Sequence, residues 1–308
     1  MSRNQGVRYF TEEQVRNGLP MKEAISLLKR AFTDYAHGRA QNQPRRRLTL
    51  DTGSVLHSLA GAWGGYFGTK VYSTNPRHGA HFTVLLYDAE TARPLAQFEA
   101  NWLGQIRTGA VSGVAADLLA PSRPLRVGCI GTGFQAQSQL QAITAVRPLD
   151  SVRVWSRQAE KRELFAREMT RLLGTQVSAA VSAEAASEGS DVLVTATWSK
   201  EPVIQASAIP AGCLVLAVGS NNPKHRELPT ETVTSSFVVV DDREACRIEA
   251  GDLLLAFDEE HWISAVELKD LVADPSRGSE RGERTVVFKS VGLGLEDVAV
   301  AAYLYERA

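Results

Sequence analysis

A glycine-rich turn between a strand and a helix is the feature that most constrains how this chain can fold. Leu125–Ile130 is an apolar run, and Phe134–Val146 has a helical pattern. Between them lies Gly131-Thr132-Gly133-Phe134-Gln135-Ala136, which fits the phosphate-binding pattern G-x-G-x-x-A. Gly131 permits the tight turn, Gly133 lets backbone N–H groups approach a pyrophosphate, and Ala136 allows close helix–strand packing. The motif predicts that residues 131–136 bind a dinucleotide cofactor; the alternative is a glycine-rich turn without a ligand.

Strand and helix patterns alternate along the chain after Pro121 and Pro124, which end an Ala- and Gly-rich helix. Short apolar runs predict strands, and the longer segments between them predict helices. The predicted strands are Leu125–Ile130, Val152–Trp155, Asp191–Thr195, Leu214–Val218 and Phe237–Val240, and the predicted helices are Phe134–Val146 and Glu160–Leu173. This alternation is typical of an α/β fold with a Rossmann-type, doubly wound parallel sheet.

The rest of the chain has a different pattern. Apolar residues recur at helical spacing from Thr11 to Tyr35, and short apolar runs between Arg47 and Phe98 predict several strands joined by turns. The sequence also predicts a helix, a polar surface loop and an amphipathic final helix, at Leu103–Ala120, Ala273–Arg284 and Leu295–Ala308. We therefore expect an α+β region in addition to the parallel sheet.

Composition excludes several classes of protein. The 308 residues are 44% hydrophobic and 22% charged with a formal net charge of −1, so no overall field favours nucleic acid or an anionic membrane. No stretch approaches the roughly 18 apolar residues of a membrane span, and the N-terminus has no apolar signal region. The three cysteines form no Cys-x-x-Cys pair, and the six histidines show no metal-ligand spacing. We expect a cytoplasmic protein with no metal site and no nucleic-acid or membrane partner.

The residues after the second strand of the predicted parallel sheet indicate which dinucleotide binds. NAD usually requires a carboxylate there for the ribose 2′-hydroxyl. This chain instead has Ser156 and Arg157, with Arg162 in the following helix. A hydroxyl and guanidinium groups suit a 2′-phosphate, because charge-assisted hydrogen bonds are strong. The sequence favours NADP(H), with NAD(H) as the alternative; for Arg157 the other interpretation is a solvated loop residue.

Two basic residues in the N-terminal region are candidates for binding a second anion. Arg107 is expected at the start of the Ala-rich helix, where free N–H groups and a guanidinium suit a carboxylate or phosphate; its alternative is a surface helix cap. Lys70 lies within the strand-like run Tyr66–Tyr72. Its side chain points either to water or inward against an anion. Burial can lower the pKa of a lysine by as much as about 3–5 units, which would suit it to donate a proton to nitrogen.

From about Pro44 to its C-terminus the chain resembles the ornithine cyclodeaminase/mu-crystallin family. The resemblance rests on several spaced motifs in a fixed order. They are Gly68-Thr69-Lys70-Val71, Ile106-Arg107-Thr108-Gly109-Ala110, Gly131 to Gln137, Gly219 to Leu228, Gly251-Asp252-Leu253, Phe288-Lys289-Ser290-Val291-Gly292, and Glu296-Asp297 to Tyr305. The resemblance implies an oxidoreductase that acts on a small amino acid or imine.

The resemblance also implies a domain organisation and a set of site residues. Residues 1–118 with 292–308 would form the substrate-binding and dimerisation domain of a homodimer, and residues 119–291 would form the Rossmann domain. The substrate would contact Arg46, Lys70, Arg107 and Asn221, and the catalytic residues would be Lys70, Arg107 and Asp297. Thr108, Thr197 and Ser220 would lie along the cofactor. For Asp297 the alternative is an acidic residue stabilised by the helix dipole.

One segment departs from the cyclodeaminase pattern. Enzymes that cyclise ornithine carry an aspartate in a Gly-Gly-Asp-x-Pro segment, whereas Gly219-Ser220-Asn221-Asn222-Pro223 has Asn221 in its place. Losing a general base costs about 10²–10⁴ in rate. The family's glutamate for a distal amine corresponds to Leu56 or His57, and neither is acidic. We therefore favour reduction of a cyclic ketimine, or of another imine of a 2-oxo acid, by hydride transfer.

Two other functions stay open at this point. The first is an ornithine cyclodeaminase or an alanine dehydrogenase-like enzyme that uses NAD, with Asp297 taking over from the missing aspartate. The second is an NADPH-binding protein without catalysis. The presence of Lys70 and Arg107 argues against the second, because binding a dinucleotide requires neither residue.

Overall fold

The computed structural model describes residues 6–308 and forms two compact units. The first consists of Met1–Arg107 with Leu293–Ala308, and the second of Thr108–Gly292. The division falls inside helix α3 (Asn101–Leu119), whereas the sequence predicted a boundary at the end of this helix. The start of α3 is tied to the first unit, because Glu12 accepts hydrogen bonds from Asn101 N and Trp102 N.

The first unit is built on a six-stranded sheet with the strand order β1-β6-β5-β4-β3-β2. Its strands are β1 (Arg8–Phe10), β2 (Gln41–Thr49), β3 (Val55–Trp63), β4 (Tyr66–Asn75), β5 (Gly79–Asp88) and β6 (Pro94–Glu99). All neighbours are antiparallel except β1 and β6. The strands expected between Arg47 and Phe98 are therefore successive hairpins, and the first of them begins earlier than predicted.

Two helices occupy the segment in which the sequence showed one helical pattern. They are α1 (Glu12–Gly18) and α2 (Met21–Ala36). Pro20 separates them, because proline cannot continue the hydrogen bonds of a preceding helix. Thr11 begins α1 with a capping box, in which its side chain accepts from Gln14 N.

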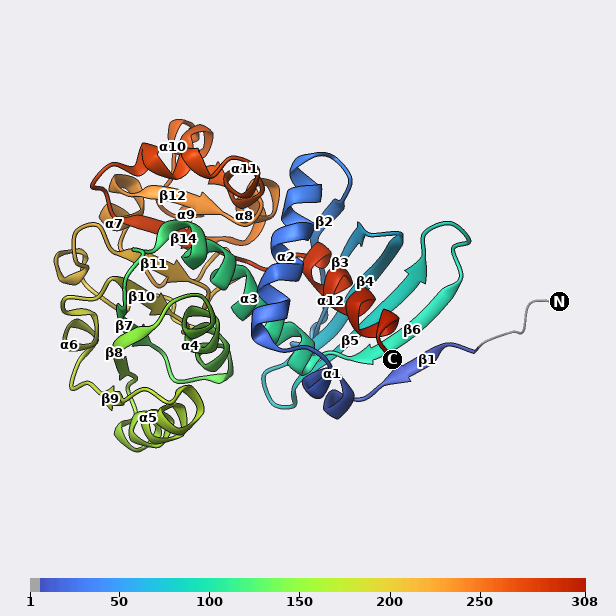
Figure 1. Cartoon of the computed structure of the whole chain (residues 1–308), viewed down its shortest axis with the longest axis horizontal. Coiled ribbons are helices and arrows are strands. Elements are labelled where there is room, and N and C mark those ends of the chain that lie inside the picture. The colour runs from blue at the N-terminus through green and yellow to red at the C-terminus, as the bar shows by residue number, and fades with distance from the viewer. Residues whose placement is uncertain (1–5) are drawn as a thin grey trace. The chain divides into compact units, whose positions relative to one another are not determined.

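The last helix, α12 (Gly294–Glu306), is buried on all sides. Every residue from Gly294 to Leu304 is buried, because α12 packs against strands β3 and β4 and also against α2 (Figure 1). The prediction of an amphipathic final helix is therefore wrong, since a helix with only one apolar stripe could not be covered all round. Glu296 and Asp297 share this burial in the first turn, where the helix dipole favours negative charge.

The second unit contains an eight-stranded sheet with the order β13-β12-β14-β11-β10-β7-β8-β9, in which all strands are parallel. The strands are β7 (Leu125–Ile130), β8 (Leu149–Trp155), β9 (Val177–Ala179), β10 (Val192–Thr195), β11 (Leu214–Ala217), β12 (Phe237–Val240), β13 (Val266–Glu267) and β14 (Val286–Lys289). Strands β8 and β9 are added on one side of β7, and the strands from β10 onward lie on its other side. Rossmann-type sheets bind their ligands where the strand order changes in this way, here between β7 and β10. The predicted fold class is confirmed.

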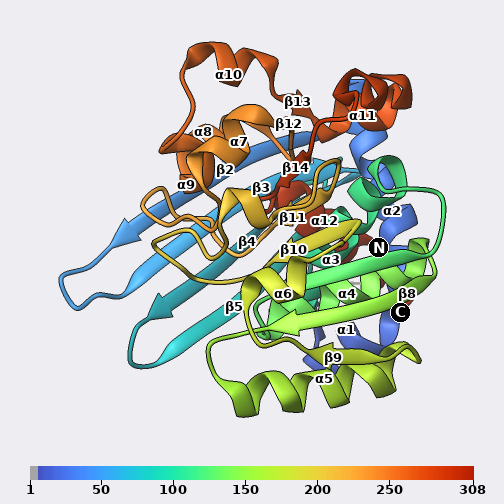
Figure 2. The ribbon, with the colours of Figure 1, turned by 90° about the vertical axis from the view of Figure 1, so that its left-hand side faces the viewer.

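Short helices connect these strands. They are α4 (Phe134–Val146), α5 (Ala159–Leu173), α6 (Ala183–Ser187), α7 (Thr230–Ser235), α8 (Arg243–Glu249), α9 (Gly251–Leu254), α10 (Glu259–Ser264) and α11 (Leu268–Ala273), with 3-10 turns at Ala206–Ala208 and Pro275–Arg281. Figure 2 shows β8 and β9 side by side with α5 next to β9. The sequence did not predict β9, β13 or β14. The first two are very short, and β14 has only three apolar residues before the buried Lys289 ends it.

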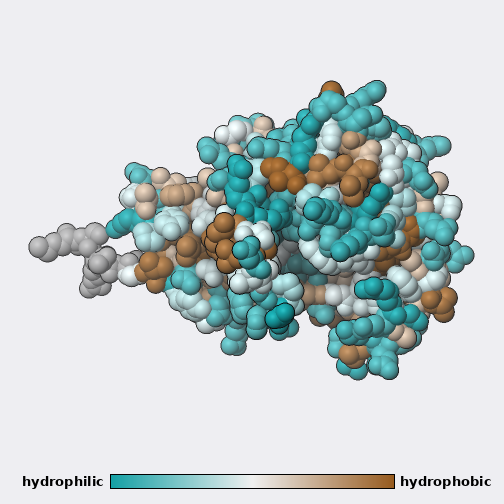
Figure 3. Space-filling model, turned by 180° about the vertical axis from the view of Figure 1, so that it is seen from behind, coloured by the Kyte–Doolittle hydropathy of each residue, from teal (hydrophilic) through white to brown (hydrophobic). Residues whose placement is uncertain are grey.

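Hydrophobic side chains on the face seen in Figure 3 form patches separated by hydrophilic ones. Within residues 6–308 no helix has both the length and the apolar character that crossing a membrane requires. In the same part of the chain, no three His, Cys, Asp or Glu side chains come together in a way that could hold a metal ion.

Candidate active site

In the first unit, close packing of α12 on the sheet depends on two glycines. A Cβ atom on Gly61 of β3 would lie 2.5 Å from Leu295 N, and one on Gly294 would lie 2.4 Å from the Ala60 carbonyl oxygen. Any side chain at either position would push the helix away from the strand. This contact brings the acidic first turn of α12 to Lys70, whose Nζ lies 3.2 Å from Asp297 Oδ1.

Four buried charged side chains meet at this point. Asp297 Oδ1 accepts hydrogen bonds from Lys70 Nζ and, at 3.1 Å, from Arg107 Nε. Arg107 Nη1 donates to Glu296 Oε2 at 2.7 Å. Lys70 is 3% exposed and Arg107 6%, so neither is the surface residue that the sequence left as an alternative. Asp297 Oδ2 is also buried and has no hydrogen-bond partner within residues 6–308, which leaves it for a ligand.

The two cations of this cluster differ in how firmly they hold their protons. Burial lowers the pKa of Lys70 to about 8; Asp297 opposes this shift, and the nearby Arg107 and Arg45 add to it. Burial also disfavours the charge of Arg107, but Asp297 and Glu296 outweigh it and raise the pKa of this guanidinium further. Arg107 therefore stays charged, whereas Lys70 can gain or lose a proton near neutral pH.

The three consecutive arginines of β2, Arg45 to Arg47, supply a third cation, but from a different residue than expected. Arg46 is exposed, whereas Arg45 is 4% exposed and its guanidinium carbon lies 5.9 Å from the centre of the Tyr72 ring. A β-bulge in β2 between Gln43 and Arg46 shifts the alternation of side chains across the sheet. The position near Lys70 that the resemblance implied for Arg46 is therefore occupied by Arg45.

The start of α3 also differs from expectation. The helix begins at Asn101, so Arg107 lies in its second turn instead of its first. The N–H groups of Asn101 and Trp102 are already bound by the Glu12 carboxylate. An anion near Arg107 would therefore be held by side-chain charges, and the helix N-terminus would not contribute.

An aromatic wall borders Lys70. Its Nζ lies 5.3 Å from the centre of the Phe82 ring and 6.0 Å from that of Tyr72. Tyr72 is stacked against both Phe82 and His57, with ring centres 4.9 and 4.2 Å apart. Burial, with the nearby Arg47 and Arg45, lowers the pKa of His57 to about 4, so its ring is neutral at physiological pH. These three rings provide an apolar surface without an anionic group.

In the second unit, the glycine-rich turn has a conformation that only glycine adopts easily. Gly131 has φ +114°, and a Cβ atom there would lie 2.4 Å from the Ala196 carbonyl oxygen. Gly133 is the N-cap of α4; no side chain caps this helix, and a Cβ atom on Gly133 would meet open space. Ala136 is fully buried. The uncapped N–H groups of α4 beside open space fit a pyrophosphate.

The end of β8 brings together three of the residues predicted to bind the cofactor. Thr132 Oγ1 donates to Ser156 Oγ at 2.9 Å, and Arg162 Nη1 donates to the Ser156 carbonyl oxygen at 3.1 Å. Arg157 follows Ser156 and is exposed. No acidic residue ends this strand, so the local charge suits a 2′-phosphate. At the start of α4, Phe134 is 43% exposed and Gln135 is half-buried.

A buried carboxylate that the sequence did not single out ties two loops together. Glu227 Oε1 accepts hydrogen bonds from Thr197 N and Thr197 Oγ1 at 2.6 and 2.8 Å. Its Oε2 accepts from Gly219 N at 2.8 Å and from Thr195 Oγ1 at 3.1 Å. These groups lie at the carboxyl ends of β10 and β11. Burial and the neighbouring Asp252 raise the pKa of Glu227 to about 7, although Lys289 opposes the shift.

Asp252 and Lys289 complete this buried network. Asp252 Oδ1 accepts from the backbone N–H groups of Glu227 and Leu228 at 2.6 and 2.9 Å, and its Oδ2 lies 2.8 Å from Lys289 Nζ. Lys289 Nζ also donates to the Ser220 carbonyl oxygen at 2.8 Å. All three charged residues stand in the motifs that carried the family resemblance, and this is the signal by which the sequence could have identified them.

The remaining predicted residues lie around the same network. Thr197 is bonded to Glu227, and the Ser220 hydroxyl is buried and donates to the His225 carbonyl oxygen. Asn221 is half-buried in the turn that follows. The Thr108 carbonyl oxygen in α3 accepts from Gln139 Nε2 at 3.2 Å, so it is bonded to the helix that follows the glycine turn.

Comparison with known proteins identifies the family of this chain. Residues 8–308 match the ornithine cyclodeaminase/mu-crystallin family. The chain belongs to this family. The family membership expected from the sequence motifs is thereby confirmed.

Relatives in the family include several kinds of oxidoreductase. A delta(1)-pyrroline-2-carboxylate reductase of Bacillus cereus is 37% identical over 97% of this chain and 96% of its own length. The structure of the Thermococcus litoralis delta(1)-pyrroline-2-carboxylate reductase, in complex with NADH and L-proline, has a TM-score of 0.92 and 32% identity, covering 98% of this chain and 97% of that one. An archaeal alanine dehydrogenase, a dimer with bound NAD, has a TM-score of 0.91 and 31% identity, covering 98% and 96%.

Proposed function

We propose that this member of the ornithine cyclodeaminase/mu-crystallin family is an NAD(P)H-dependent oxidoreductase that reduces the C=N bond of a cyclic ketimine or another imine of a 2-oxo acid. The observation that carries the proposal is the buried Lys70, which has a pKa of about 8 and lies between a carboxylate and guanidinium groups. A proton donor whose pKa lies near the working pH is most effective. The pyrroline-2-carboxylate reductases among the relatives support this assignment.

The charges of the first unit suit a substrate that carries a carboxylate. Arg45, Lys70 and Arg107 are three buried cations close to the buried carboxylates of Glu296 and Asp297. Arg107 and Arg45 could bind a substrate carboxylate through charge-assisted hydrogen bonds. Asp297 holds the Lys70 ammonium in position through its Oδ1 atom.

The proton and hydride of the reaction have separate sources. The nicotinamide cofactor, when bound, would supply the hydride for the imine carbon. Lys70 Nζ gives a proton to the imine nitrogen, so one C–H and one N–H bond form, and the lysine is left neutral until solvent reprotonates it. Arg107 keeps the substrate carboxylate in place. This binding also fixes the orientation of the C=N bond relative to Lys70.

The groups around Lys70 favour a ring over a chain that ends in an amine. Phe82, Tyr72 and the neutral His57 form an apolar wall, and they offer no carboxylate to a distal ammonium group. Asn221 replaces the aspartate that cyclodeaminases use. Both features count against ornithine as the substrate. They leave oxidation of an amino acid, the reverse of the proposed reaction, as the second candidate, which the alanine dehydrogenase relative supports.

The glycine turn and the residues at the end of β8 would hold the cofactor, and we propose NADP(H) as the preferred form. The uncapped N-terminus of α4 suits the pyrophosphate, and Thr108, Thr197 and Ser220 would lie along the rest of the molecule. Glu227 and Lys289 hold the loops that contain the last two of these residues. Replacing Arg157 with Ala should reduce the preference for NADPH over NADH by about tenfold, about 1.4 kcal/mol. Fluorescence titration with both cofactors measures this ratio.

The function is tested by mixing the purified full-length chain with NADPH and a panel of imines. We expect NADPH absorbance to fall with pyrroline-2-carboxylate or piperideine-2-carboxylate, or with pyruvate and an amine. Ornithine and NAD should give no ammonia. Turnover of ornithine to proline and ammonia, without reduction of any imine in the panel, would overturn the proposal.

We also propose that the chain acts as a homodimer. Strand β2 is at an edge of its sheet, and Leu48 faces Leu56 across the β2–β3 pair with both side chains exposed, at 61% and 46%. Exposed apolar pairs at a sheet edge are typical of contact surfaces. Sedimentation equilibrium tests the proposal, which a monomer at micromolar concentration would contradict.

A further inference from the structure

A cavity of about 380 Å³ in the second unit lies at the amino ends of the parallel strands. Its lining includes Phe237 and Val266, the first residues of β12 and β13, and Arg284, shortly before β14 begins. In a parallel sheet the amino-terminal ends of all strands lie together at one end of the sheet, and the carboxyl-terminal ends lie together at the opposite end. The glycine turn follows the carboxyl end of β7, so the cavity is separate from the proposed cofactor site.

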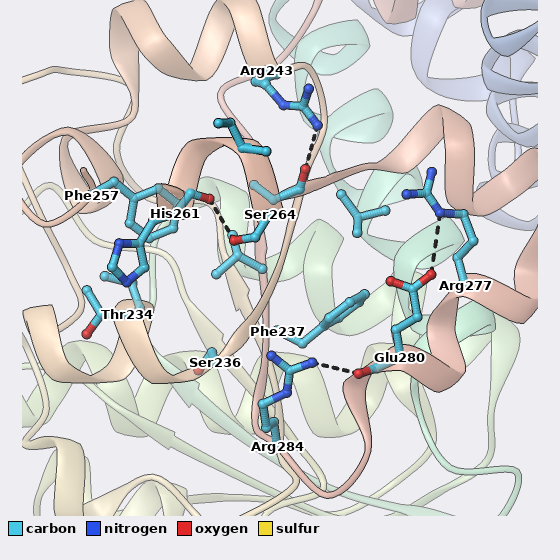
Figure 4. A pocket seen from close by; sticks show the side chains of 15 residues that line it. Thr234, Ser236, Phe237, Arg243, Phe257, His261, Ser264, Arg277, Glu280 and Arg284 are labelled. Carbon is cyan, nitrogen blue, oxygen red and sulfur yellow. Dashed lines mark hydrogen bonds and ion pairs between the residues drawn. The ribbon is translucent and has the colours of Figure 1, made fainter. Parts of the chain in front are cut away.

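The charged residues that line the cavity are mostly basic. Arg243, Arg277 and Arg284 face a single acidic lining residue, Glu280. The lining residues alone carry three positive charges and one negative charge, and Asp270, which pairs with Arg277 from outside the lining, reduces the net charge from +2 to +1, in a chain whose formal net charge is −1. In the view of Figure 4 the three arginines lie on different sides of Phe237, above it, to its right and below it.

Among the residues that the structure describes, two of these arginines have no carboxylate partner. Arg277 lies 3.3 Å from an Asp270 oxygen and 3.8 Å from one of Glu280. Arg243 Nη2 instead donates to the Ala265 carbonyl oxygen at 2.6 Å, and Arg284 Nη2 donates to the Glu280 carbonyl oxygen, also at 2.6 Å. A carbonyl accepts a hydrogen bond without neutralising a charge. Within residues 6–308, Arg243 Nε is in addition a buried donor without a hydrogen-bond partner.

The rest of the lining is mixed: Thr234, Ser236, His261 and Ser264 are polar, and the other residues are apolar. Val233, Phe237 and Val238 are buried residues of the lining, and the guanidinium carbon of Arg284 lies 5.5 Å from the centre of the Phe237 ring. Pockets for small molecules have volumes of about 300–1,000 Å³, so this one suits a small ligand. A ligand with an acidic group and an apolar body would match both kinds of wall.

We propose that this cavity is a binding site for a small organic anion, distinct from the substrate and cofactor sites. A carboxylate or phosphate group would be held by Arg243 and Arg284, and the apolar body would lie against Phe237. Guanidinium groups bind both kinds of acid through paired hydrogen bonds. Because the site is defined by binding, it does not depend on which reaction the chain catalyses.

Calorimetric titration of the full-length chain with benzoate, phenyl phosphate and benzamide tests this proposal. We expect saturable binding of at least one of the two anions, and the better one identifies the acid group. Benzamide has nearly the shape of benzoate without its charge and should bind at least tenfold more weakly than the better anion.

Variants locate the binding. Arg284→Gln changes an exposed residue and should weaken anion binding about tenfold, and Arg243→Met with Arg284→Gln should remove it. Arg45→Met, which removes a guanidinium from the proposed substrate site, should leave it unchanged. Thermal unfolding of each variant shows that the chain is folded. The proposal fails if neither anion binds, if benzamide binds equally well, or if Arg284→Gln leaves the anion affinity of a folded protein unchanged.

Discussion

The two units each bury a lysine among carboxylates, and the two lysines differ in what their surroundings do to the proton. Lys70 lies 3.2 Å from one carboxylate oxygen and near two guanidinium groups, and its pKa is lowered to about 8. Lys289 lies 2.8 Å from Asp252 and near Glu227. Burial disfavours the charge of Lys289, but the two carboxylates outweigh it and raise its pKa.

This difference in pKa suits Lys70 to proton transfer and Lys289 to a structural role. Both lysines are buried, so burial alone does not decide their roles. The balance of the neighbouring charges does: near Lys70, Asp297 is opposed by Arg107 and Arg45 and does not offset the effect of burial, whereas near Lys289 the two carboxylates do offset it. We therefore expect Lys70 to transfer protons and Lys289 to hold loops in place.

Replacing Lys70 with Met should lower kcat for imine reduction by about 10²–10⁴, because the proton donor is lost. NADPH affinity should stay within about twofold, since no cofactor-binding residue changes. Steady-state kinetics and cofactor fluorescence measure the two effects. A kcat within tenfold of the unmodified chain would show that Lys70 is not the donor.

Replacing Lys289 with Met should destabilise the protein by about 3–5 kcal/mol, because Asp252 and Glu227 would remain buried without their cation. Lys70→Met should cost less, since Asp297 keeps its bond to Arg107. Urea unfolding of both variants compares the losses. Equal losses would remove the distinction between the two lysines.

Arg45 and Arg46 form a matched pair that differs in burial. Arg45→Met should reduce kcat/KM for a carboxylate substrate by about 10- to 100-fold, as expected for losing a hydrogen bond between charged groups. Arg46→Met should change it by less than about twofold, because this residue is exposed. Initial rates over a range of imine concentrations measure both variants. The reverse order of effects would restore the assignment that the sequence suggested.

The pH dependence should report the lowered pKa of Lys70. The protonated amine is the donor, so the rate of reduction should be level below about pH 8 and fall about tenfold for each further unit. An unshifted lysine would keep its proton to about pH 10.5. Rates with saturating NADPH measure the profile. In Lys70→Arg, which keeps its proton, the fall near pH 8 should be absent from the remaining activity; a fall at the same pH would assign the titration to another group.

Local sequence was enough to predict the parallel sheet and the glycine turn. Strand β7, helix α4 and the turn between them lie within a short stretch of chain, and their apolar pattern and glycines are properties of neighbouring residues. The identity of Lys70 and Arg107 as candidate site residues also followed from motifs of adjacent residues. Their burial did not, because a lysine in a strand can face either side of a sheet.

The sequence by itself determined the fold class, the family and the phosphate-binding turn, because each depends on residues close together in the chain. Only the tertiary structure decided that Arg45 and not Arg46 lies near Lys70, because a bulge in β2 shifts which side chains face inward. It also decided the partners of the buried charges. Asp297 meets Lys70 across 227 positions and Lys289 meets Asp252 across 37. The sign of each pKa shift depends on these neighbours, which are distant in sequence. The hydrophobic pattern along the chain therefore cannot predict it.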